Sequence, residues 1–126
     1  MKKNELERTL NTIAHEFECD AVIGNEFAYY YEENLIVVDP FDKDEAFLNF
    51  ARKNGLNETV SSFVISFFHE LGHNETIDFV EEYDGDKNAL SAEEYFSLEE
   101  EFEATAWAID FCNEHLELVK EIEKNL

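Results

Sequence analysis

The chain is poor in basic residues. Nine lysines and arginines stand against 31 aspartates and glutamates, which gives a formal net charge of −22. Charge of this sign repels phosphate backbones and anionic membrane surfaces, so we expect no direct binding to nucleic acid and no membrane partner. The same surface attracts basic proteins, although an acidic exterior more often serves only to keep a protein soluble.

Cysteines and long apolar runs are also scarce. Cys19 and Cys112 are the only cysteines and cannot form a disulfide framework, and reduced thiols are typical of cytosolic proteins. No stretch approaches the ~20 apolar residues of a membrane span, and the first residues lack the apolar run of a signal peptide. These absences predict a cytoplasmic protein.

Apolar residues are nevertheless plentiful. They make up 44% of the 126 residues and include twelve phenylalanines, which is enough for a hydrophobic core. A chain of this length is too short for two comfortable domains, so we expect one domain over residues 1–126.

In the N-terminal third, the spacing of the apolar residues predicts one helix and then strands. A helical period covers residues 4–18, and short apolar runs follow at 21–23, 27–31 and 35–39. We expect the last two runs to form a hairpin. The sheet edge near Leu35–Asp39 could then align an extended peptide by strand addition.

Helical spacing returns in the rest of the chain. One helix is predicted from Asp44, a second after Asn57 as its N-cap, and a single long helix from residue 92 to about 124, where no glycine or proline intervenes. We therefore expect an α+β fold in which the small sheet packs on the second of these helices. The N-terminal and C-terminal helices complete the core.

The helix after Asn57 contains the pentapeptide HELGH, in which His69 and His73 are four residues apart. Residues i and i+4 lie on one helix face roughly 6 Å apart, so both imidazoles can reach one Zn²⁺. Glu70 is rotated by about 100° from His69, which keeps it near such an ion as a base rather than a ligand. H-E-x-x-H on a helix is the signature of zinc peptidases. The preceding residues Ser62 and Ser66 are small, which favours this prediction over two unrelated histidines.

A catalytic zinc also needs a third protein ligand. His15 and His115 have no supporting pattern around them, whereas the run LEEEFEATAWAIDFC offers several glutamates on one predicted helix. Helical phase places Glu101 on a lane of small residues that another helix can approach, and Glu103 on a charged, solvated face. Glu101 is therefore the predicted ligand, with Glu100 as the reserve and Glu103 as the alternative if the phase is wrong.

Three further residues have predicted supporting roles. Thr105 follows Glu101 by one helical turn and could accept a hydrogen bond from a ligating histidine, which would fix its tautomer. Tyr83 and Tyr95 lie between the two motifs and are candidate donors to an oxyanion. Packing against the core is the alternative for both tyrosines.

HELGH followed by E-x-E-A-x-x-W-A, from Glu101 to Ala108, resembles the ImmA/IrrE family of gluzincin-type metallopeptidases, whose second motif is E-x-E-A-N-x-F-A. The resemblance covers about residues 35–108, with Thr105 in place of the family's Asn and Trp107 in place of its Phe. It implies a zincin fold, zinc held by His69, His73 and Glu101, and Glu70 as general base. It also implies a protein substrate, typically a transcriptional repressor.

We therefore expect a zinc-dependent metallopeptidase that cleaves a protein, plausibly a basic DNA-binding regulator of phage, mobile-element or stress genes. The rival hypothesis is a non-enzymatic acidic binding protein, such as a DNA mimic or antirepressor, with a structural or vestigial zinc. The net charge of −22 favours the rival, and the glutamate beside His69 favours the enzyme.

Overall fold

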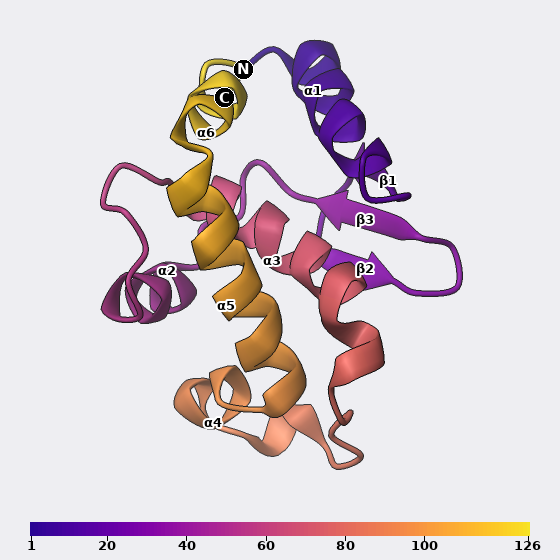
Figure 1. Cartoon of the computed structure of the whole chain (residues 1–126), viewed down its shortest axis with the longest axis vertical. Helices are drawn as coiled ribbons and strands as arrows, with labels where there is room; N and C mark the ends of the chain where they lie inside the picture. The colour runs from indigo at the N-terminus through magenta and orange to yellow at the C-terminus, as the bar shows by residue number, and fades with distance from the viewer.

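The computed structural model describes all residues, 1–126, and has the predicted α+β fold (Figure 1). A three-stranded sheet follows the first helix, and the remaining helices complete the chain. The α-helices and strands are α1 (Lys3–His15), β1 (Asp20–Ile23), β2 (Ala28–Tyr30), β3 (Leu35–Val38), α2 (Glu45–Lys53), α3 (Ser62–Thr76), α4 (Ala92–Phe96), α5 (Glu99–Glu114) and α6 (Leu116–Glu123).

The sheet has the strand order β1-β3-β2. β2 and β3 form the predicted antiparallel hairpin, and β1 pairs with β3 in parallel. The prediction of a peptide-binding edge at Leu35–Asp39 is wrong, because the parallel partner β1 makes β3 the central strand. The two edges of the sheet are β1 and β2.

Side chains of α1 cover the β1 edge of the sheet. The backbone N–H of Ala21 donates to Asn11 Oδ1 and that of Ile23 donates to Glu7 Oε2, each over 2.8 Å. An edge strand whose N–H groups are satisfied in this way is a poor template for a further strand. No side chain covers β2 in the same way, so β2 is the open edge.

Helix α3 lies between the sheet and α5 (Figure 1). Its apolar residues, including Val64, Phe67, Phe68 and Leu71, are fully buried and form the centre of the core. At Gly72 the helix meets the backbone of α5, where any Cβ would collide with the carbonyl group of Ala104. The absence of a side chain at Gly72 thus sets how closely α3 and α5 approach.

Besides the earlier end of α1, at His15 rather than residue 18, two helix predictions differ from the structure. The expected long C-terminal helix is three helices, because Leu98 is extended (φ −58°, ψ 140°) and His115 leaves the helical region (φ −129°, ψ 49°). The first break lets Phe96 pack against Phe47 and Phe50 of α2, and the second lets α6 return toward α1. Packing with distant segments therefore overrides a continuous helical period.

The start of α3 is the second difference. The helix begins at Ser62, with the Ser61 hydroxyl accepting from the N–H of Val64, and not at Asn57. Asn57 instead accepts from Thr59 in the preceding turn. None of the helices combines the length and the apolar composition that a membrane-spanning segment requires.

Candidate metal centre

His69 and His73 face α5 from one side of α3. Their Nε2 atoms lie 3.1 Å apart, and their side chains are only 11% and 18% exposed. An aromatic ring bounds each imidazole: Phe47 meets His69 edge-on and Tyr29 stacks parallel to His73. The burial of this face of α3 holds both rings in place.

Glu101, in the first turn of α5, completes a triangle with the two histidines. Its Oε1 lies 3.0 Å from His69 Nε2 and 3.1 Å from His73 Nε2, and its side chain is 3% exposed. The three sides of the triangle therefore measure 3.0–3.1 Å. Donors bound to a tetrahedral zinc at 2.0–2.1 Å lie about 3.3 Å from each other, so the triangle has the size that such an ion requires.

Thr105 fixes which nitrogen of His69 faces the triangle. The Thr105 hydroxyl donates to the Glu101 carbonyl oxygen over 2.9 Å, so its oxygen is left to accept from His69 Nδ1–H, also at 2.9 Å. The proton of neutral His69 is therefore on Nδ1, and Nε2 carries a lone pair. This is the tautomer that a metal ligand needs, and it arises through the contact predicted for Thr105.

The chemistry of this donor set fits a cation. Three atoms that can offer lone pairs meet in a buried space, where they repel each other unless a proton or a metal ion lies among them. Burial alone would raise the pKa of Glu101 and lower that of His73. The contacts of Glu101 with His69 and His73 outweigh burial and hold the pKa of Glu101 well below its usual value, and the contact with Glu101 raises the pKa of His73. A metal ion must displace the proton that this pair holds, so its binding weakens as the pH falls.

Glu70 lies beside the triangle. A carboxylate oxygen of Glu70 is within 4.8 Å of ring nitrogens of both histidines, further than the Glu101 oxygen. Burial raises its pKa, and the charge of Glu101 adds to this effect although the histidines oppose it. A carboxylate near the triangle with a raised pKa suits a general base better than a ligand.

The other predicted candidates lie outside the triangle. Glu100 accepts from the N–H of Tyr83 and pairs with Lys87, while Glu103 is exposed on the outer face of α5. His15 pairs with Asp20 at the surface, and the Nδ1 of His115 contacts the carbonyl oxygen of Phe111. The structure thus brings together His69, His73, Glu101, Glu70 and Thr105, has Glu100 and Tyr95 in the lining of the adjoining cavity, and leaves His15, His115, Glu103 and Tyr83 outside the site.

Lys87 is part of the site although the sequence did not single it out. Its Nζ lies 3.1 Å from Glu101 Oε2 and 3.2 Å from Glu100 Oε2. It therefore holds the oxygen of Glu101 that points away from the histidines. One sequence signal was available. Lys87 is the only lysine or arginine between Lys53 and Lys120, and a single cation in an acidic segment is expected to form an ion pair with a nearby carboxylate.

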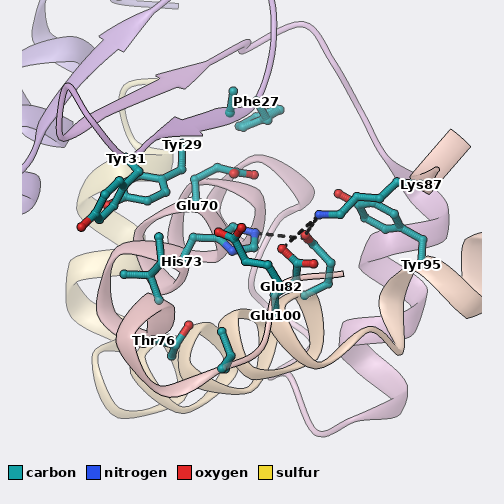
Figure 2. A pocket seen from close by; sticks show the side chains of 14 residues that line it. Phe27, Tyr29, Tyr31, Glu70, His73, Thr76, Glu82, Lys87, Tyr95 and Glu100 are labelled. Atoms are coloured by element: carbon teal, nitrogen blue, oxygen red, sulfur yellow. Dashed lines mark hydrogen bonds and ion pairs between the residues drawn. The ribbon is translucent and has the colours of Figure 1, made fainter. Parts of the chain in front are cut away.

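A cavity of about 340 Å³ opens onto the triangle beside His73. Figure 2 shows Tyr29 and Tyr31 on one side of it, Lys87 and Tyr95 on the other, and Glu70 and His73 between them. Of the two tyrosines predicted as oxyanion donors, Tyr95 lines this cavity and Tyr83 does not.

The open strand β2 borders the same cavity. Phe27, Ala28 and Tyr29 belong to its lining, so a chain that paired with the β2 edge would lie alongside the triangle.

Comparisons of the chain with models of known protein families, with curated proteins and with solved structures give no match.

Proposed function

We propose that the protein is a zinc-dependent peptidase. The observation that supports this most directly is the buried triangle of His69 Nε2, His73 Nε2 and Glu101 Oε1, with Glu70 beside it at the mouth of a cavity. Two imidazoles and one carboxylate, with one position left open, are the donor set of zinc peptidases.

The roles of the side chains follow from their positions. A zinc ion held by the triangle would supply a Lewis acid that polarises the substrate carbonyl and makes water more acidic. Glu70 takes a proton from the attacking water and passes it to the leaving amine. The Tyr95 hydroxyl donates to the carbonyl oxygen as charge develops on it. Its raised pKa, due mainly to burial, keeps it protonated for this role.

The proposed substrate is a protein or peptide in extended conformation. The open edge of β2 offers backbone groups to such a chain next to the cavity. The net charge of −22 favours a basic partner, and the resemblance to the ImmA/IrrE family suggests a transcriptional repressor in the cytoplasm.

Metal content and one substitution test the proposal. The purified protein should hold about one zinc per chain by elemental analysis. Glu70→Gln should keep the zinc and lose hydrolysis by ~10²- to 10⁴-fold, because it removes the base and leaves the ligands. Glu75→Gln, the same change later on α3 and outside the cavity, should behave as the unaltered protein.

The substrate can be found with the same pair of variants. Fragments that appear in cells making the unaltered protein or Glu75→Gln, but not Glu70→Gln, identify the protein that is cut. Zinc content near zero after reconstitution at neutral pH would contradict the proposal. So would full hydrolysis by Glu70→Gln.

A second function is supported by the charge alone. A non-enzymatic acidic protein could occupy the DNA-binding surface of a basic regulator and keep zinc only for stability. Under this alternative, the unaltered protein and Glu70→Gln would bind the regulator equally well, and neither would cleave the regulator. Glu70 weighs against this alternative, because a structural zinc needs no half-buried carboxylate beside its ligands.

A further inference from the structure

A second cavity, of about 200 Å³, adjoins the triangle on the side of His69. Phe27, Glu70 and Tyr95 line both this cavity and the one beside His73. The two cavities therefore meet at the candidate general base. A peptide whose scissile bond lay over Glu70 would direct neighbouring side chains into both.

The lining of the second cavity has no cation. It contains Asp42, Asp44 and Glu70 and no lysine or arginine, whereas in the first cavity Lys87 offsets part of the charge of four glutamates, Glu70, Glu82, Glu100 and Glu101. Asp44 accepts the N–H of Phe47 with one carboxylate oxygen, 2.9 Å away, and its other oxygen is free. Asp42 has no side-chain partner in the chain. Two carboxylate groups at this mouth thus have acceptor capacity left over.

The walls of the second cavity are aromatic. Phe27, Phe47 and Phe96 line it, and the rings of Phe47 and Phe96 pack with centroids 5.6 Å apart. Such walls suit the aliphatic stem of a long side chain, and ring faces attract a cationic head.

A serine hydroxyl also faces this cavity. Ser66 lies one helical turn before Glu70, is 6% exposed and lines the cavity. Its oxygen makes no hydrogen bond within the chain, and it is not fully covered, since Ser62 Oγ is the one fully covered side-chain oxygen without a partner. The Ser66 hydroxyl can therefore accept a hydrogen bond from a side chain that enters the cavity.

We propose that the second cavity is a subsite for a lysine or arginine side chain of the substrate, with its stem against Phe47 and Phe96 and its charged head between Asp42 and Asp44. This inference rests on the proposed peptidase function and names its substrate class: peptides with a basic residue beside the scissile bond.

Binding to a protein that cannot cleave tests the subsite separately from catalysis. The probes are two labelled peptides that differ at one central residue, arginine or its neutral isostere citrulline, and fluorescence anisotropy measures their affinity for zinc-loaded Glu70→Gln. The arginine peptide should bind about 10-fold more tightly, from one partly exposed ion pair and contact with the rings.

Two further changes assign the preference to the cavity. Adding Asp42→Asn and Asp44→Asn should bring the ratio close to 1, and asparagine at 44 keeps the N-cap of α2. The control pair Asp84→Asn and Asp110→Asn changes the net charge equally at exposed positions outside both cavities and should leave the ratio unchanged.

The possible results separate the two proposals. Equal binding of the two peptides, or a preference that survives Asp42→Asn and Asp44→Asn, overturns the subsite even if hydrolysis is found. A preference that these changes abolish supports the subsite even if the unaltered protein cleaves neither peptide. The lack of cleavage would then count against the peptidase proposal alone.

Discussion

Two histidine–carboxylate pairs of this chain have almost the same contact distance and very different surroundings. His15 Nε2 lies 2.9 Å from Asp20 Oδ1, and these side chains are 62% and 66% exposed. His69 Nε2 lies 3.0 Å from Glu101 Oε1, and these side chains are 11% and 3% exposed. The distances alone do not distinguish the two pairs.

The difference lies in what surrounds each contact. Water and salt screen the exposed pair, and such pairs contribute about 0–1 kcal/mol to stability. The buried pair has a second imidazole, a hydroxyl that fixes the tautomer and a lysine behind the carboxylate. Convergence and burial, rather than one short contact, turn a histidine and a carboxylate into a candidate metal centre.

The largest difference between the two pairs is expected in zinc affinity when the carboxylate of each pair is removed in turn. Glu101→Ala should weaken zinc binding roughly 100- to 1000-fold. Structural zinc sites with four protein ligands bind with about 10–16 kcal/mol, which is about 2.5–4 kcal/mol per ligand, and this change removes one of the three ligands proposed here. Asp20→Ala should leave the affinity unchanged. Titration against a competing chelator measures both, with Glu103→Ala as a control on α5. Release of zinc by Glu103→Ala but not by Glu101→Ala would refute the proposed ligand set.

A smaller effect is expected from the hydroxyl that only the buried pair has. Thr105→Val keeps the shape of the side chain but removes the acceptor for His69 Nδ1–H, so zinc affinity should fall ~10- to 100-fold. Thr12→Val removes a hydroxyl that contacts only the Arg8 carbonyl oxygen on exposed α1, and should change nothing. The same chelator titration applies. Equal affinities for the two variants would show that the tautomer of His69 does not matter.

Lys87→Met tests whether the lysine behind Glu101 stabilises the buried pair in the metal-free protein. It removes the cation next to the buried Glu101 carboxylate, so the free energy of unfolding should fall by about 1 kcal/mol, a value reduced by the partial exposure of Lys87. Zinc should lessen the loss because it takes over neutralisation of the carboxylate. Urea unfolding with and without zinc measures this, and Lys124→Met, which removes an exposed pair with Glu121, is the control. A loss that zinc does not reduce would contradict the explanation.

The smallest effect is expected at the exposed pair itself. His15→Asn should change the free energy of unfolding by less than about 0.5 kcal/mol, because that contact is screened. The urea midpoint provides the measurement. A loss comparable to that of Lys87→Met would mean that burial is not what separates the two pairs.

Periodicity predicted the parts of the site that lie on single helices. The i, i+4 spacing of His69 and His73 and the phase that separates Glu101 from Glu103 are properties of a regular helix, and the structure has Glu101 buried and Glu103 exposed. The α+β class followed from the same patterns. The hairpin of β2 and β3 also follows from the local sequence, because its strands are adjacent in the chain.

The missed features depend on contacts between distant segments. The pairing of β1 with β3, which makes β2 the open edge, has no local signal. Nor do the breaks at Leu98 and His115, where packing of Phe96 and of α6 decides the path of the chain. Lys87 reaches Glu101 only because the segment after α3 folds back over α5.

The contact of Gly72 with Ala104 has a consequence for selectivity among metal ions. Two helices whose backbones touch would hold the proposed ligands at a fixed separation, because the distance between the helices is set on folding and cannot widen to suit a larger ion. A fixed set of two nitrogens and one oxygen suits a small dication that accepts four ligands. Calcium, which takes six to eight oxygens at 2.3–2.6 Å, would find too few donors held too close together.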